Sequence, residues 1–428
     1  MVRDNEKIEA VSAERADQMP GACSEMGNDC EHGVVNLAGR ETAICGGASA
    51  SCFTRRDFLR TAAVLSAGAA MFGFASALSG CSVLRGNLRT ICDMGGREVA
   101  VPEKISRVFC SNPIGTVDLY LLDPDVLVGW NFKPTGDNRK YIPEVYLNMP
   151  SLGVWMGSGA TPNDEEIVRQ SPDAILCYWT ADDVGRDMAD AVRDETGCPV
   201  LLIDYDIRNC AEMYRYVGPL LGRDERAEEL AAYCEEKLAR IRKVAAAVPE
   251  SERRSVYIAQ GLGGLSTDPV GSMHVTDALD LLGIENVAYL PGTEGKGMGM
   301  PSVNLEQIIQ WNPYAVLVSE YSMSDSESSN LYGEIRDDSD WANVVAVREG
   351  RVWRLPQSPF AWFGRPPSVV RLLGCMLVMK LVYPECCADV DMVEETRSFY
   401  KLFYRLELDD DELIDILDTA GVDVSELR

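Results

Sequence analysis

The sequence predicts an α/β protein built from two Rossmann-like lobes with parallel sheets, joined by one long rigid helix. Apolar segments of strand length alternate with helical segments in two separate stretches of the chain, and one long helical segment lies between them. The strand-like segments are almost continuously apolar, as in a parallel sheet that helices cover on both faces. Ligands of such sheets bind at the carboxyl ends of the strands, so we expect a ligand cleft between the lobes.

The first lobe is expected over residues 107–222. It begins with Arg107-Val108-Phe109-Cys110, an apolar run that leads through Ser111-Asn112-Pro113 into a helical pattern. Later in this stretch Pro172 ends a helix directly before another apolar run, because proline does not continue a helix. We expect strands at 107–110, 125–130, 173–178 and 199–204, and helices at 116–122, 165–170 and 187–196.

A lobe-linking helix is expected over residues 223–249. Its core, 224–248, is helical in pattern without interruption. At the α-helical rise it would be roughly 37 Å long, which is unusual for a crossover helix. A helix of this length would hold two lobes at a fixed separation.

The second lobe is expected over residues 250–388, where the alternation of strands and helices begins again. An acidic C-terminal helical tail follows at 389–428. Leu413, Ile416 and Leu417 form one apolar face of a helix in the tail, which we expect to pack on the second lobe. In the second lobe we expect strands at 255–259, 314–319 and 351–355, and helices at 275–282, 304–310 and 367–381.

The two halves contain the same local pattern, which indicates an internal repeat of a whole lobe. Residues 163–168 read NDEEIV and residues 304–309 read NLEQII. Each is followed after two residues by an x-Pro-x-Ala-x-Leu strand, at 171–176 and at 312–317. One copy alone is ordinary α/β sequence, but two copies at matching places favour a repeat.

The charge balance argues against nucleic acid as a partner. The chain carries a formal charge of −27 at pH 7. Residues 81–428 hold 33 basic and 57 acidic side chains, a net charge of −24. Acidic surfaces repel phosphate backbones.

An export signal is expected near the N-terminus. Residues 54–59 read TRRDFL, a paired arginine before large apolar residues, and Leu78-Ser79-Gly80-Cys81 reads as a lipid-attachment site. The alternative is an N-terminal helix with chance arginines. We expect a disordered N-terminal extension at 1–53, a twin-arginine lipoprotein signal peptide at 54–80, and a lipidated tether and lead-in at 81–106, with lipid on Cys81 anchoring the protein to the outer side of the cell membrane.

The cysteines do not predict a metal centre. Of fourteen, four precede the signal and Cys81 would carry lipid, which leaves an odd number of nine. These nine include no C-x-x-C pair and no Cys/His pair at metal spacing. Most of them lie in apolar runs and are expected to be buried thiols. We therefore expect neither a bound metal nor a resident cofactor.

With these features in place, residues 89–384 resemble the ABC-transporter solute-binding proteins of the ferric-siderophore, heme and cobalamin type. The resemblance is carried by the linking helix, the paired Glu-bearing helices, the segments GLGGLST at 261–267 and GSMH at 271–274, and WFGRPPS at 362–368. It implies a non-catalytic protein that captures a metal chelate and delivers it to a permease and its ATPase. It also implies that Glu165 and Glu306 dock to arginines of the permease. Alternatively, both are carboxylates that favour a helix N-terminus.

Large flat chelates require aromatic faces and a few directed polar groups. Loops at the expected cleft supply both, and Trp155 and Trp362 match positions where cobalamin-binding members resemble this chain. The expected ligand contacts are Asn112, Trp155, Met156, Trp179, Tyr205, His274, Tyr321, Trp362, Phe363 and Arg365.

Each of these contacts has a structural alternative. The tryptophans could belong to the core, and Arg365 could hold its loop in place instead of pairing with a ligand carboxylate or phosphate. His274, the single histidine after residue 32, could be an axial metal ligand, although its place at a helix start favours a role toward the backbone. Related proteins often have an acidic residue where this chain has Gly364.

Two rival functions remain open from the sequence. Proteins of related fold bind an oxyanion such as molybdate, and twin-arginine export commonly serves redox enzymes that fold around a cofactor. A G-x-G-x-x-G motif does not follow either Val108 or Val256, and we find no catalytic constellation in the sequence. A solute-binding protein, and not an enzyme, is the expected function.

Overall fold

The computed structural model describes residues 87–155, 161–292, 300–320 and 330–428. These residues belong to the second of two compact units, which begins at Ala77. The extension, the signal peptide and Cys81 lie outside the described residues, as do Met156 and Tyr321.

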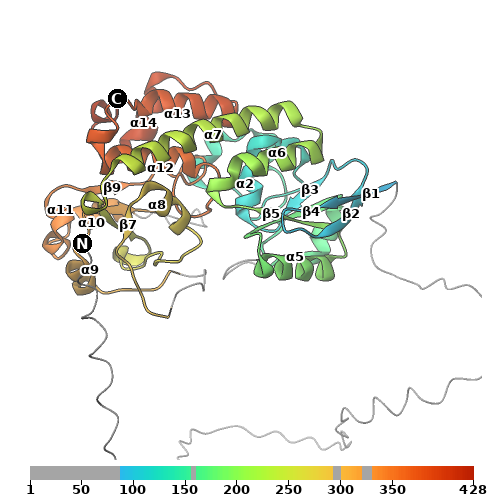
Figure 1. Ribbon diagram of the computed structural model, residues 1–428, viewed down its shortest axis with the longest axis horizontal. Coiled ribbons are helices and arrows are strands. Elements are labelled where there is room, and N and C mark those ends of the chain that lie inside the picture. Colours follow the sequence, from blue (N-terminus) through green and yellow to red (C-terminus); the bar gives the residue numbers. More distant parts are fainter. Residues whose placement is uncertain (1–86, 156–160, 293–299, 321–329) are drawn as a thin grey trace, which may run out of the picture. The chain divides into compact units, whose positions relative to one another are not determined.

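The first lobe is a parallel three-stranded sheet in the order β3-β4-β5 (Figure 1). Side chains of neighbouring residues in these strands pack in two different cores. Val108, Leu176 and Leu201 contact helices α2 and α6, whereas Phe109 and Ile175 contact α4 and α5. The elements are β3 (Val108–Cys110), β4 (Ala174–Trp179), β5 (Val200–Asp204), α2 (Pro113–Leu122), α3 (Glu144–Leu147), α4 (Asp164–Gln170), α5 (Asp183–Thr196) and α6 (Cys210–Leu221).

The expected strand at 125–130 is wrong as a regular strand. The Asp123 side chain accepts a hydrogen bond from Asp125 N and begins a 3-10 turn, Pro124–Val126. Only two isolated bridges remain in the segment, from Leu127 to Val108 and from Trp130 to Ser151. Local turn formation therefore replaces the ladder that the apolar pattern suggested.

The segment expected as a lead-in is instead a part of the first lobe. Strands β1 (Leu88–Cys92) and β2 (Glu98–Pro102) form an antiparallel hairpin. Asp93 Oδ2 accepts a hydrogen bond of 2.9 Å from Leu202 N, and Arg97 Nη2 donates one of 2.8 Å to Val200 O. These bonds fasten the hairpin to β5.

The expected linking helix is confirmed as α7 (Asp224–Ala247), 24 residues long. At the α-helical rise it measures about 36 Å. Its buried stripe includes Leu230, Cys234, Leu238 and Ile241, which are spaced by three or four residues. Figure 1 shows α7 running from the first lobe to the second.

The second lobe is a parallel sheet in the order β7-β6-β8-β9. Val256 and Leu317 pack toward α8 and α12, whereas Tyr257 and Val316 pack toward α9, α10 and α11. The elements are β6 (Ser255–Ala259), β7 (Glu285–Asn286), β8 (Ala315–Val318), β9 (Val352–Arg354), α8 (Thr276–Leu282), α9 (Leu305–Trp311), α10 (Leu331–Asp337), α11 (Val345–Arg348) and α12 (Arg371–Val382).

The geometry of α4 and α9 agrees with the expected repeat. Asn163 and Asn304 cap the two helices, each of seven residues, by accepting a backbone N–H two residues into the helix. Each helix ends at a left-handed residue, Ser171 with φ 49° and Asn312 with φ 48°. A proline and a central strand follow in both lobes.

Two helices begin at other residues than expected, because polar groups fix their starts. Helix α5 begins at Asp183 and not at residue 187, since Asp182 Oδ1 accepts a hydrogen bond from Gly185 N. Helix α12 begins at Arg371 and not at residue 367. Before it, the chain forms tighter turns, in which Arg371 N donates to Ser368 O and Leu372 N to Val369 O, and Val369 N donates to Asp118 in the first lobe.

A continuous apolar core joins the lobes. One cluster of buried side chains includes residues of β3, β4, β5, α7, β6, β8 and α12. The close approach of α12 contributes to it, because a Cβ on Gly374 would lie 1.8 Å from Trp362 O. Lobes that share a core resist separation more than lobes joined by a flexible linker.

The C-terminal tail contacts both lobes and not only the second. Helix α13 (Met392–Phe399), a π-helical turn (Tyr400–Tyr404) and α14 (Asp410–Asp418) pack beside α12. Leu413, Ile416 and Leu417 are buried, as expected. Arg405 Nη2 donates to Leu121 O at 3.0 Å and to Leu122 O at 2.6 Å, at the end of α2 in the first lobe.

Asp118 on α2 is a fully buried carboxyl group at the junction of the lobes. Its Oδ1 accepts a hydrogen bond of 2.8 Å from Val369 N. Burial raises its pKa to about 7, although this bond and Arg371 favour the charged form. The folded protein therefore holds a proton on Asp118 at pH values where the unfolded chain has released it.

Stability should consequently fall as the pH rises from about 4 to about 7, and an Asp118→Asn variant should lack this loss. The shift of about three pKa units corresponds to roughly 4 kcal/mol. We expect the stability advantage of wild type over the variant, measured as the difference between their free energies of unfolding, to decrease by roughly 4 kcal/mol between pH 4 and pH 8. Urea titrations of both proteins measure it, and a difference that does not change with pH contradicts the prediction.

Candidate functional site

Polar side chains gather where the strands of the second lobe end. We call the set the strand-end cluster. Gln260 directly follows β6 and Ser319 directly follows β8, so the fold brings them to the same edge of the sheet. The full cluster is Gln260, Asp268, Ser272, His274, Ser319 and Arg365.

Asp268 is the centre of this cluster and has no exposed surface. Its Oδ1 accepts from Arg365 Nη2 at 2.6 Å and from Ser272 Oγ at 2.8 Å. Its Oδ2 accepts from Gln260 Nε2 at 3.0 Å. A buried carboxylate with three charged or polar donors holds the surrounding side chains in fixed orientations.

Other polar atoms of the cluster are buried without a hydrogen-bond partner among the described residues. They are Gln260 Oε1, Ser319 Oγ and His274 Nδ1. Buried polar atoms are nearly always paired, and each unpaired one costs about 1–3 kcal/mol. Such atoms gain most from the polar groups of a bound solute.

Gly364 keeps the cluster open. It has φ +91°, and a Cβ there would lie 3.5 Å from Ser319 Oγ and 3.9 Å from Gln260 Nε2. Any larger side chain would be strained and would cover these two groups. The glycine therefore leaves space beside the polar atoms that the cluster offers.

His274 is neutral in this environment. Burial, helped by the positive charge of Arg365, lowers its pKa to about 4 against the opposing charge of Asp268. A neutral imidazole has a lone pair on one ring nitrogen, which can accept a hydrogen bond or ligate a metal. The sequence left these alternatives open, and the geometry is compatible with both.

Tyr205 from the first lobe lies near the same cluster. It follows β5, and the charges of Asp277 and Arg371 affect its pKa, which burial raises. Asp277 accepts from both η nitrogens of Arg371, at 2.5 and 2.8 Å, and from Ile207 N of the first lobe at 3.3 Å. Arg371 Nη1 also donates to His274 O at 3.5 Å. Asp277 and Arg371 thus lie between Tyr205 of the first lobe and the His274 backbone of the second.

Three other expected contacts of the first lobe have structural partners. Asn112 caps α2 and donates to Tyr178 O at 2.6 Å. Trp155 donates to Glu195 Oε2 at 2.6 Å, and its ring packs on Phe109. Trp179, at the end of β4, packs against the same core as Phe109. These bonds and packing contacts stabilise the first lobe itself, as the structural alternative for each residue proposed.

Trp362 and Phe363 have no exposed surface. The Trp362 indole donates to Ser358 O at 3.2 Å, and its ring packs on Tyr400. Neither ring can stack on a ligand from this position. The structure instead leaves Arg365 as the member of this segment that reaches the strand-end cluster.

Glu165 and Glu306 occupy matching places on the two lobes. Each lies in the first turn of its helix, α4 or α9, and each is exposed. A carboxylate at a helix start is stabilised by the helix dipole. The positions leave both side chains accessible to a partner protein.

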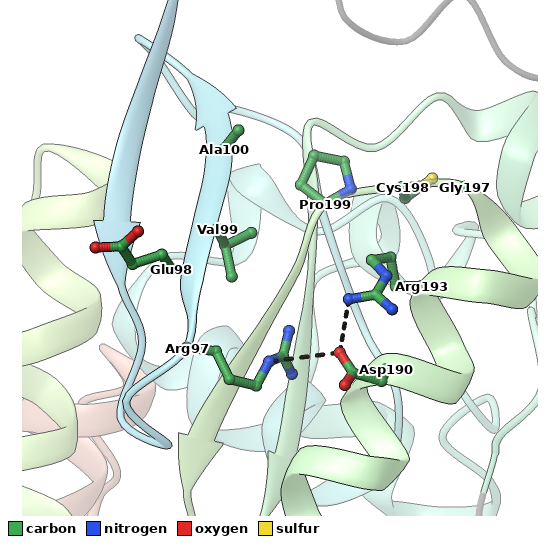
Figure 2. A pocket seen from close by; sticks show the side chains of 9 residues that line it. All are labelled: Arg97, Glu98, Val99, Ala100, Asp190, Arg193, Gly197, Cys198 and Pro199. Atoms are coloured by element: carbon green, nitrogen blue, oxygen red, sulfur yellow. Dashed lines mark hydrogen bonds and ion pairs between the residues drawn. The ribbon is translucent and has the colours of Figure 1, made fainter.

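A separate hollow of about 520 Å³ lies beside the hairpin (Figure 2). Its charges are paired: Asp190 Oδ1 is 2.7 Å from Arg193 Nη1 and 3.6 Å from Arg97 Nε. Pro199 in its lining directly precedes β5, so the hollow is at the amino end of that strand. The hollow thus lies at the amino edge of the first sheet, whereas the strand-end cluster lies at the carboxyl edge of the second, and we assign the hollow no ligand.

The described ranges contain no group of three or more His, Cys, Asp or Glu side chains that could hold a metal ion. None of the nine cysteines in these ranges, seven of them buried, belongs to a disulfide. No described helix is long and apolar enough to cross a bilayer.

Known proteins match this chain in sequence and in structure. The model of the family described as periplasmic binding protein matches residues 157–359. A solved ABC transporter solute-binding protein from Sulfurospirillum deleyianum superposes with a TM-score of 0.68 at 28% identity, covering 77% of this chain and 99% of that one. The chain is thus similar to the periplasmic binding proteins over these residues, and its two helix-linked lobes agree with the fold of a solute-binding protein.

Two curated relatives differ in the ligand that they are named for. The molybdate-binding protein MolA of Haemophilus influenzae is 31% identical over 107 residues, 25% of this chain and 28% of MolA. The heme uptake protein IsdE of Staphylococcus aureus is 23% identical over 229 residues, 53% of this chain and 73% of IsdE. The first match therefore spans less than a third of that relative's length.

Four members of the cluster, Gln260, Asp268, Ser272 and Ser319, were not among the contacts expected from the sequence. Gln260 and Ser319 each follow an expected strand directly, and that position was a usable signal for a polar ligand contact. Asp268 carried no such signal, because its partner Arg365 is 97 residues away in sequence.

Proposed function

We propose that this protein captures a metal chelate, namely a ferric siderophore, heme or a corrinoid, and delivers it to an ABC permease and its ATPase. The observation that carries the proposal is the strand-end cluster, where polar atoms without partners among the described residues lie beside Gly364 at the lobe junction. Arg365 and His274 supply a positive charge and a neutral imidazole to a solute bound there. Chelates with acceptor oxygens, such as carboxylate, amide or hydroxamate groups, suit that combination.

The proposal also concerns where in the cell the protein functions. We propose twin-arginine export through the segment at 54–80 and lipid attachment at Cys81, on the sequence signals alone. A lipid anchor would keep the protein beside its permease. We further propose that the protein binds its solute without catalysing a reaction, since the proteins that it resembles are binding proteins.

An oxyanion such as molybdate is the second candidate ligand. The MolA match favours it, and so do the chemical groups of the cluster. Ser319 Oγ and the Arg365 guanidinium are hydrogen-bond donors of the kind that hold oxyanions. The two ligand classes differ in size and in absorbance, so one experiment separates them.

The experiment titrates the purified protein with heme, cyanocobalamin, ferric desferrioxamine B and sodium molybdate. Tryptophan fluorescence reports binding, and visible spectra report contact with a chromophore. We expect one chelate to bind at micromolar or tighter affinity, and Arg365→Ala to weaken that binding at least tenfold. Tight binding of molybdate alone would replace the chelate proposal. A resident chromophore with turnover would contradict binding without catalysis.

A further inference from the structure

A leucine is held out into solvent by a turn of three left-handed glycines in the second lobe. Leu262 is 95% exposed, more than any other large apolar side chain of the described residues. Its neighbours Gly261, Gly263 and Gly264 have φ of 65°, 61° and 74°. Only glycine adopts such a run without strain, so the sequence fixes this shape of the turn.

The turn is held against the second lobe by a hydrogen bond and by backbone packing. Tyr257 donates its hydroxyl hydrogen to Gly264 O at 2.8 Å. A Cβ on Gly264 would lie 2.7 Å from Ile335 Cδ1 and 3.2 Å from Trp341 Cζ2, so the backbone packs directly on α10 and the segment after it. Leu262 therefore projects from a rigid base. Single exposed leucines are common, and the surface around this one decides its meaning.

A groove of about 600 Å³ adjoins the turn. We call it the acidic groove. Its floor is apolar, made of Trp341, Leu265 and Leu305, and its rim carries three exposed carboxylates. The complete lining is Gly263, Leu265, Leu305, Glu334, Asp338, Asp340 and Trp341, which contains no lysine or arginine.

The acidic groove is continuous with Glu306. Leu305 lines the groove and is the first residue of α9, and the exposed Glu306 follows it. Leu262 likewise adjoins Gly263 on the opposite side of the groove. One face of the second lobe thus combines an apolar projection, an apolar floor and four carboxylates. A partner segment that is complementary to this face in charge and polarity would have basic residues around an apolar side chain.

We infer that the acidic groove and Leu262 are a docking surface for a basic, apolar loop of the permease, adjoining the Glu306 contact. The inference rests on the proposed function and names more of the partner's chemistry. The two lobes present unequal surfaces, because in the first lobe Asn112 leads the chain from β3 directly into α2. The groove therefore also fixes which way round the protein sits on the permease.

The test measures ATP hydrolysis by the ABC importers of the cell that produces this protein, each reconstituted in proteoliposomes. The full-length protein is added with each of the four probes named above and without any. We expect Leu262→Ser, and separately Glu334→Gln with Asp340→Asn, to raise the concentration for half-maximal stimulation at least tenfold. Val145→Ser, at a 69% exposed site on α3, is the matched control and should change nothing.

The outcomes separate the inference from the proposed function. Stimulation by wild type that neither set of variants weakens overturns the docking surface and leaves the function standing. Failure of wild type to stimulate any importer overturns both. Light scattering that shows a dimer of wild type and a monomer of Leu262→Ser overturns the inference, because the occupant would then be a second copy of this chain.

Discussion

Replacing Arg371 with methionine is expected to lower the free energy of unfolding by about 3–5 kcal/mol, because the change leaves a buried carboxylate without its partner. The Arg371 side chain has no exposed surface and pairs with both oxygens of Asp277. Asp277 also accepts Ile207 N from the first lobe. The loss should therefore weaken the junction of the lobes as well as the pair itself. Urea unfolding followed by tryptophan fluorescence measures the change.

A matched control is Arg397→Met, which breaks a more exposed pair with Asp410 and should cost less than about 1 kcal/mol. Adding Asp277→Leu to Arg371→Met should recover part of the lost stability, because the unpaired charge disappears. If Arg371→Met is as stable as Arg397→Met, the buried pair does not stabilise the junction.

Removing Glu165 and Glu306, the two carboxylates expected to dock to the permease, should have the largest effect on transport. We expect Glu165→Ala with Glu306→Ala to raise the concentration for half-maximal stimulation of the importer about a hundredfold, and each single change about tenfold. Tenfold corresponds to about 1.4 kcal/mol for each lost charge pair, which is below the cost of about 2–5 kcal/mol for a fully buried pair, because both glutamates are exposed. Titration of importer ATPase activity with each variant measures it.

Glu225→Ala is the control for this experiment, since Glu225 is also an exposed glutamate in a first helical turn. It should leave stimulation unchanged, and all of these variants should bind the chelate like wild type. A double variant that stimulates like wild type would assign Glu165 and Glu306 to helix stabilisation alone.

Much of the fold could be predicted from the sequence because its signals are local. The linking helix shows a long apolar stripe, and α4 and α9 show the same cap, length and terminating proline. The errors occur where a single polar side chain outweighs the pattern. Asp123 caps a 3-10 turn where a strand was expected, and Asp118 of the first lobe holds Val369 N in the segment where α12 was expected to begin.

The candidate site was less predictable because its contacts are distant in sequence. Tryptophans at loop ends suggested stacking, but burial depends on tertiary packing, and Trp362 lies in the core. Arg365 and His274 were identified from the sequence, and their common partner Asp268 was not. Hydrogen bonds across 97 residues leave no local pattern from which to infer them.

The central claim is that this protein binds a chelate and passes it to an importer. The most direct measurement is uptake of heme, cyanocobalamin or ferric desferrioxamine B into proteoliposomes that contain the permease, the ATPase and ATP. We expect one of these chelates to accumulate inside only when the protein is present, and the double Glu165→Ala, Glu306→Ala variant to need about a hundredfold more protein for the same accumulation. Uptake that is equal with and without the protein would contradict it.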